Sequence, residues 1–268
     1  INISIANCEL RINNCLVKMG AAGVMIPLFS HTEERYDNPK YEVLWRTAER
    51  LNVPISLVAG TLRPVHKLIP ASQVDHLHYL FDLLQLDTNH NDLMYRLVYQ
   101  ASEAIYPRIA LSAMILSGVF NRYPALNVIT VGFGATWVPH FMARIDEMDD
   151  VRPERSGSEL FNSTVKEENA HFGLHLEQKG FDMSQEGKPS SYFHRNIYMT
   201  VQDDRIGHYL ERIVSGERLL WGSDYPHQPS SSSSSVELIE KQRLQISNRE
   251  YDQISGGNIA SLYQFSTN

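Results

Sequence analysis

The sequence has few cysteines, no excess of basic residues and no long apolar run. Its two cysteines, Cys8 and Cys15, lie seven positions apart and would share one face of a helix. A reduced, buried pair is a better interpretation than a disulfide, so we expect a reducing, cytoplasmic compartment. No apolar stretch approaches the roughly 20 residues that a membrane helix needs, and the start at Ile1 lacks the features of a signal peptide. We therefore expect no membrane association.

The charge balance is acidic. The chain has 24 Lys and Arg against 31 Asp and Glu, a formal net charge of −7. Because phosphate binding needs clustered Lys and Arg, and no dense basic run is present, the sequence argues against nucleic acid as a main partner. The apolar fraction of 43% suffices for a sizeable core, and 268 residues fit a single domain over 1–268.

Short apolar runs alternate with longer amphipathic stretches, which is typical of βαβ units and a parallel sheet. Helices are predicted from Pro39, behind an Asn38 N-cap, to a stop at Asn52, over 110–120, and from near Thr136. The apolar runs are nearly continuous, as expected for strands covered on both faces. The five predicted strands are residues 23–27, 54–58, 128–131, 196–200 and 218–221.

Two segments depart from this pattern. Residues 151–191 are rich in Glu, Ser, Gly and Lys, and they predict a long excursion between the third and fourth strands. Residues 230–235 are six serines, a composition typical of a flexible loop. Five strands are too few for a closed eight-stranded barrel. Either three strands precede Ile1 in the natural protein, or the fold is an open sheet.

The most specific segment is Trp221-Gly222-Ser223-Asp224-Tyr225-Pro226-His227, directly after a predicted strand. Catalytic groups of parallel α/β folds sit at the carboxyl ends of strands, so Asp224 is placed to bind a divalent metal and accept a proton. The alternative is an aspartate that caps a turn or helix. His227 either contacts a substrate carboxylate and relays a proton, or only orients the turn.

The segment Trp221–His227 resembles the last-strand motif of the amidohydrolase family related to aminocarboxymuconate-semialdehyde decarboxylase. The resemblance spans nearly the whole chain and implies a metal-dependent, TIM-barrel-like (β/α)₈ α/β fold with only its later strands in this chain. It further implies hydrolysis or decarboxylation of a small, often aromatic or carboxylate-bearing substrate. Other segments follow the order of that family: residues 23–27, 41–45, 54–60, 117–124, 137–146, 192–198 and 257–263.

The resemblance makes Asp224 the last-strand metal ligand, which also serves in proton transfer. The expected metal is zinc, with manganese or iron as alternatives. His31, which follows the first strand where barrel loops face the active site, is a predicted substrate contact, and Trp137 is assigned the same role. The partner is expected to be a small-molecule substrate, and a homodimer is the expected assembly.

The chain also departs from the family. Val58 stands where members commonly have a histidine ligand, Gly132-Phe133-Gly134 stands where they usually have His or Glu, and no His-x-His pair precedes Gly23. A catalytic zinc typically takes three protein ligands, and Asp224 alone cannot hold one. Three hypotheses follow: a metal-dependent enzyme completed by ligands from preceding strands, a metal-free binding or assembly subunit, and a metal-free enzyme that uses Asp224 and His227 as an acid–base pair. The intact Asp224 motif favours the first.

Overall fold

The computed structural model describes residues 20–28, 36–58, 104–150, 187–202, 214–223, 235–243 and 246–265. Within these ranges the chain forms a five-stranded sheet whose strands are all parallel and follow one another in chain order. This order confirms the predicted βαβ pattern, and no strand boundary differs from its prediction by more than one residue. The strands are β1 (Val24–Pro27), β2 (Ile55–Val58), β3 (Val128–Val131), β4 (Ile197–Val201) and β5 (Leu219–Trp221).

The helix between β1 and β2 has both of its predicted ends. It starts as the short 3₁₀ helix η3 (Pro39–Tyr41) and continues as α2 (Glu42–Arg50). The Asn38 side chain accepts a 3.0 Å hydrogen bond from the amide of Lys40, which satisfies a donor that the first turn leaves free. Asn52 has a φ of 50° and stops the helix in the left-handed region that asparagine tolerates.

The helix predicted over 110–120 is in fact two helices, and it begins earlier. These are α5 (Ile105–Leu116) and α6 (Val119–Arg122). Gly118 lies between them with a φ of 72°, a conformation that glycine adopts at little cost and that ends a helix. The next helix, α7 (Val138–Asp150), begins two residues after Thr136, close to the predicted start.

The two predicted loop segments end in regular structure. Residues 151–186 and 230–234 lie outside the described residues. The end of the predicted excursion is the 3₁₀ helix η6 (Pro189–Ser191), because the amide and hydroxyl of Ser190 each donate a 2.8 Å hydrogen bond to Asp146 of α7. Ser235, the last of the six serines, is the first residue of a helix, α12.

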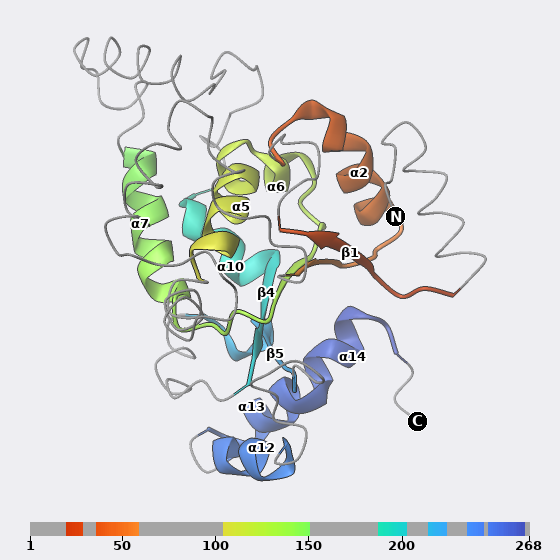
Figure 1. Cartoon of the computed structure of the whole chain (residues 1–268), viewed down its shortest axis with the longest axis vertical. Coiled ribbons are helices and arrows are strands. Elements are labelled where there is room, and N and C mark those ends of the chain that lie inside the picture. Colours follow the sequence, from red (N-terminus) through yellow and green to blue (C-terminus); the bar gives the residue numbers. More distant parts are fainter. Residues whose placement is uncertain are drawn as a thin grey trace, which may run out of the picture.

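The other helices precede or follow the last two strands. Helices α12, α13 and α14 lie together in the lower part of Figure 1, and α2, α5, α6 and α7 lie in its upper part. Among the helices of the described ranges, none is long and apolar enough to cross a membrane. Their bounds are α10 (Tyr192–Arg195), η7 (Gly216–Arg218), α12 (Ser235–Arg243), α13 (Asn248–Asp252), the π-helix η8 (Gln253–Gly257) and α14 (Asn258–Leu262).

Both faces of the sheet are apolar, because alternate strand residues enter two different cores. Leu57 and Met199 are buried in the main core, together with residues of α2, α5 and α7. On the other face, Ile129 and Leu220 pack with Leu262 of α14 in a smaller cluster. Strands covered on both sides need apolar residues at successive positions, which explains the nearly continuous apolar runs.

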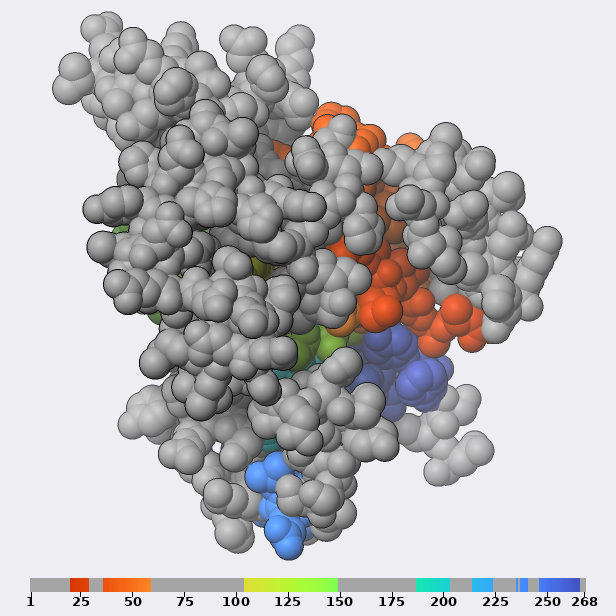
Figure 2. Space-filling view, viewed as in Figure 1, coloured from red at the N-terminus to blue at the C-terminus, as the bar shows by residue number. Residues whose placement is uncertain are grey.

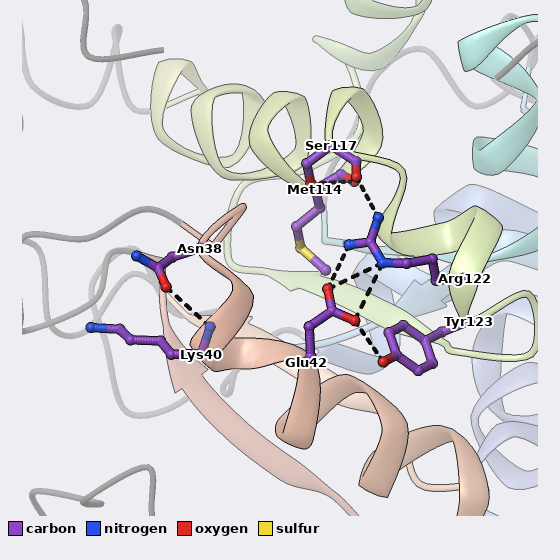
Figure 3. Close-up of polar contacts among 7 residues, drawn as sticks. All are labelled: Asn38, Lys40, Glu42, Met114, Ser117, Arg122 and Tyr123. Carbon is purple, nitrogen blue, oxygen red and sulfur yellow. Dashed lines mark hydrogen bonds and ion pairs between the residues drawn. The ribbon is translucent and has the colours of Figure 1, made fainter. Parts of the chain in front are cut away.

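Helices α2 and α6 are joined by a charged contact on the main-core side (Figure 3). Arg122 donates to the Glu42 carboxylate through Nε at 3.1 Å and through Nη2 at 2.5 Å, and Nη1 donates to the Ser117 carbonyl at 2.6 Å. The Tyr123 hydroxyl donates to the same carboxylate at 2.6 Å. Burial, the hydrogen bond to Glu42 and the charge of Glu42 raise the pKa of Tyr123 to about 12, so its hydroxyl stays protonated at neutral pH.

The C-terminal segment packs against the amino ends of the strands. Asn258 donates 2.8 Å hydrogen bonds to the carbonyls of Gly216 and Leu219 at the start of β5. Tyr263 lies so close to Gly23 that a Cβ there would come within 2.8 Å of its ring, and Figure 2 shows the dark-blue C-terminal residues beside the orange N-terminal ones. Besides packing on one face of the sheet, the C-terminal segment therefore contacts the amino ends of β1 and β5, opposite the edge where catalytic groups are expected.

Candidate functional site

The carboxyl ends of the strands share one edge of the sheet. The register places Val58 beside Val131 at the ends of β2 and β3, and pairs Val201 with Trp221 at the ends of β4 and β5. In parallel α/β folds the loops after the strands converge at this edge and supply the catalytic groups. The chain reaches Asp224 three residues after Trp221, so this edge is the candidate site.

The side chain of Thr200 joins β4 to the end of β3. Its Oγ1 accepts a 2.9 Å hydrogen bond from the amide of Gly132 and donates a 3.4 Å bond to the carbonyl of Thr130. Gly132 is exposed and has a φ of 86°, in the left-handed region that favours glycine. The chain therefore turns away from the sheet directly after β3, at a residue without a side chain.

Gln202 joins β4 to the chain that follows β5. Its Nε2 donates a 3.0 Å hydrogen bond to the carbonyl oxygen of Ser223, the residue immediately before Asp224. Sequence reasoning missed both Gln202 and Thr200. The available signal was a pair of polar residues at alternate positions where an apolar strand ends, because alternate residues share one side of a strand.

Tyr36 fixes the carboxyl end of β1. Its hydroxyl donates to the carbonyl of Pro27, and its ring meets Tyr41 and Trp45 edge-on, with centroids 5.1 Å and 5.8 Å away. Burial, followed by the nearby Tyr41, raises the pKa of Tyr36 well above its ordinary value of 10.0. The phenol therefore remains a neutral hydrogen-bond donor and has a structural role at this strand end.

Trp137 lies in the core beside the loop that follows β3. Its indole N–H donates a 3.0 Å hydrogen bond to the carbonyl of Gly134, and its side chain packs on Phe141 and Phe193. Only 7% of Trp137 is exposed. These contacts make it a support for the loop after β3, and the predicted contact with a substrate stays a prediction.

The described strand ends do not by themselves form a metal site. Val58, on the sheet face opposite the main core, and Gly132 have no donor atoms in their side chains, and neither has Phe133. Within the ranges that the structure describes, no group of three His, Cys, Asp or Glu side chains could hold a metal ion. These residues do not fit a bound metal, so a metal would depend on Asp224 and on ligands outside these ranges.

The remaining predicted site residues lie outside the described residues. These are Asp224, His227 and His31, together with the cysteines Cys8 and Cys15. The described part of the edge supplies a hydroxyl, a carboxamide and backbone groups, which can hold and orient neighbouring atoms. Asp224 and His227 stay the predicted acid–base groups.

Comparison with known proteins identifies a protein family and solved structures that are similar to this chain. A protein-family model described as amidohydrolase matches residues 4–265, which is almost the entire chain. A search among curated proteins finds no match.

Solved structures share the fold. An amidohydrolase from Mycobacterium avium subsp. paratuberculosis K-10 is 14% identical with a TM-score of 0.66, over 98% of this chain and 56% of that one. The 5-carboxyvanillate decarboxylase from Sphingomonas paucimobilis is 19% identical with a TM-score of 0.62, over 98% of this chain and 64% of that one. A manganese-bound dihydroxybenzoic acid decarboxylase from Polaromonas sp. JS666 is 19% identical with a TM-score of 0.59, over 96% of this chain and 64% of that one. The chain thus spans less than two thirds of each of these proteins, and it has part of a TIM-barrel-like α/β fold, as predicted.

Proposed function

Because this chain belongs to the amidohydrolase family, we propose that it is part of a metal-dependent hydrolase or decarboxylase. The family membership agrees with the resemblance seen in the sequence, and it makes the chain a member of an enzyme family. The proposed substrate is a small molecule that is aromatic or bears a carboxylate. The observation that supports this most is the Trp221–Asp224 segment at the carboxyl end of β5, in an all-parallel sheet.

We assign the chemistry to three side chains. Asp224 serves as metal ligand and as proton acceptor, because it follows a strand end where catalytic groups of parallel α/β folds gather. His227 contacts the substrate and relays a proton, and His31, after β1, is a second substrate contact. When bound, a divalent metal supplies Lewis-acid chemistry and lowers the pKa of water. Thr200 and Gln202 link neighbouring strand ends at the carboxyl edge of the sheet.

The metal proposed for this site is a divalent cation. The decarboxylase from Polaromonas holds manganese, as does a 5-carboxyvanillate decarboxylase from Novosphingobium aromaticivorans. A carboxylate ligand suits manganese, and zinc also accepts carboxylate oxygens. Zinc as the resident metal stays a prediction, as do the homodimer and the cytoplasmic location.

A second candidate function is a binding or assembly subunit without metal. Two observations favour it: β2 ends in Val58, and β3 is followed directly by Gly132, whose φ of 86° suits glycine. Neither strand end offers a donor side chain, whereas a catalytic zinc typically takes three protein ligands. The intact strand-end Asp224 is the reason that the enzyme is preferred.

The two functions are separated by an assay on the complete protein loaded with manganese or zinc. Release of carbon dioxide is measured on a panel of hydroxylated benzoates, and hydrolysis is measured on a matched panel of lactones and amides. We expect turnover on one panel, and loss of at least about 100-fold of it in Asp224→Asn, a typical effect of removing a general acid–base group. Binding of panel members without any turnover would favour the binding subunit instead.

A further inference from the structure

One row of residues crosses all five strand ends on the sheet face opposite the main core. Pro27 of β1 pairs with Val58 of β2, and Val58 pairs with Val131 of β3. The row continues on β4 with Thr200, whose Oγ1 accepts a hydrogen bond from the amide of the residue that follows Val131. It ends at Gly222, directly after β5, because a Cβ on Gly222 would meet Thr200 Cβ at 3.9 Å. These five residues form the carboxyl-edge row.

The carboxyl-edge row has no side chain that suits a metal ion or a charged group. Its proline and its two valines have hydrocarbon side chains, and its glycine has none. The hydroxyl of Thr200 already accepts from the amide of Gly132 and donates to the carbonyl of Thr130. Burial of a charge against such a surface costs free energy that no group of the row returns, whereas burial of apolar surface is favourable.

The row is accessible at the edge of the candidate site. Successive strand residues point to opposite faces of a sheet, so each member of the row has neighbours that face the main core. Two of these neighbours, Leu57 and Met199, are 0% exposed, whereas all five members of the row are half-buried. The row therefore presents apolar surface at the edge where the catalytic groups of parallel α/β folds gather.

The other end of the same face is already covered by the C-terminal segment. Leu262 of α14 packs on Ile129 and Leu220. The hydroxyl of Tyr263 lies 3.4 Å from that of Ser56, two positions before the β2 member of the row. The cover of this face thus comes from the amino side, and the row lies toward its carboxyl end.

We infer that the carboxyl-edge row binds the hydrocarbon face of the substrate and takes no part in metal binding. The inference deepens the proposed function, on which it rests, because it assigns one part of the substrate to this side of the site. Strands of a sheet lie about 4.8 Å apart, so three neighbouring strands span about 10 Å. A planar six-membered ring fits a surface of this width, and Val58 and Val131 lie at its centre.

A purely structural role for the two valines is the alternative, and the two roles predict different measurements. Valines that only support the strand ends would contribute to stability and leave ligand affinity unchanged. Valines that contact a ring would make affinity depend on the ring of the ligand. Benzoate and acetate are suitable probes, because both have a carboxylate and benzoate alone has a ring.

The test variant is the double substitution Val58→Thr and Val131→Thr. Threonine has nearly the shape of valine, and it adds a hydroxyl that loses water when a ring covers it. Both residues are β-branched and suit a strand, so the fold is kept. Val24→Thr is the matched control, because Val24 is also a half-buried strand valine but packs on the main core near the amino end of β1.

The experiment measures the dissociation constants of benzoate and acetate by isothermal titration calorimetry on the complete protein, alongside thermal unfolding of each variant. We expect wild type to bind benzoate at least about 10-fold more tightly than acetate, with a negative heat-capacity change. The double variant should lose about 10-fold of its benzoate affinity. The control should stay within about 2-fold of wild type. If the double variant does not fold, Val58→Thr alone takes its place.

The outcomes separate this inference from the proposed function. Equal affinity of wild type for benzoate and acetate would overturn the ring-binding role, as would unchanged benzoate affinity in the double variant. An equal loss in Val24→Thr would also overturn it, since the effect would then follow from stability alone. Ring-dependent binding of benzoate without turnover on either substrate panel would instead overturn the proposed function and leave the row as the ligand surface of a binding subunit.

Discussion

The guanidinium of Arg122 donates hydrogen bonds to both carboxylate oxygens of Glu42, a residue 80 positions earlier in the chain. The contact ties α2 to the short helix α6, and through Arg122 Nη1 to the break between α5 and α6 at Ser117. Two-point contact between a guanidinium and a carboxylate fixes direction as well as distance. Helix α2 is therefore joined to α6 and to the end of α5 through this one guanidinium.

Removal of this contact should destabilise the fold. Arg122→Leu is expected to lower the free energy of unfolding by about 1 kcal/mol, at the upper end for pairs that solvent partly reaches. Urea unfolding followed by circular dichroism measures the change. The matched control is Arg144→Leu, because Arg144 pairs with Glu147 within α7 and both side chains are more than half exposed. A loss in the control as large as that in Arg122→Leu would contradict a special role for the Glu42 contact.

The same carboxylate should make stability depend on pH. Partial burial raises the pKa of Glu42, but hydrogen bonds from Arg122 and Tyr123 and the charge of Arg122 outweigh it and hold the pKa below its ordinary value of 4.5. A lowered pKa in the folded state contributes stability that is present above the unfolded-state value and is lost as pH falls through the folded-state value.

We therefore expect the stability difference between wild type and Glu42→Gln to be largest near neutral pH and to shrink as pH falls below 4.5. Urea unfolding at a series of pH values between about 3 and 7 measures it, a range that spans the titration of a carboxylate. Glu147→Gln serves as the control, since Glu147 is 55% exposed. A difference that grows toward acid pH would mean that the carboxylate is not held in its charged form.

The turn at Gly118 gives a third prediction. Its φ of 72° lies in the left-handed region, so Gly118→Ala should cost about 1 kcal/mol of stability. Gly216→Ala is the control, because a Cβ there would meet only Glu250 Cγ at an ordinary 3.7 Å and its φ is not in that region. Thermal unfolding of both variants measures the loss of stability. An unchanged melting temperature for Gly118→Ala would contradict a strained geometry at this position.

Strand positions could be predicted from the sequence because buried parallel strands require apolar residues at successive positions. The break between α5 and α6 could not, since a single glycine within an apolar run is compatible with a continuous helix until the tertiary structure fixes its φ. Ser190 shows the same limit, because its bond to Asp146 joins residues 44 positions apart. The sequence around either residue does not indicate such a contact.

The candidate site was predicted only in part. The parallel direction of the strands and the segment after residue 221 can both be read from the sequence, and together they predict which edge of the sheet holds the site. Gln202 and Thr200 were not predicted, because their roles depend on which strands are neighbours. Gln202 hydrogen-bonds to Ser223 after β5, and Thr200 hydrogen-bonds to Gly132 after β3. Asp224, His227 and His31 lie outside the described residues, so their roles stay predictions.

The most direct test of the proposed function is the metal content of the complete protein, purified without added metal and measured by elemental mass spectrometry. We expect about one equivalent or more of zinc, manganese or iron per chain, as in a metal-dependent enzyme. Asp224→Ala should lose most of it, while Asp252→Ala, at an exposed position in α13, should keep it. Metal near zero in the wild-type protein, unchanged after reconstitution, would contradict the metalloenzyme and leave a metal-free binding subunit or acid–base enzyme.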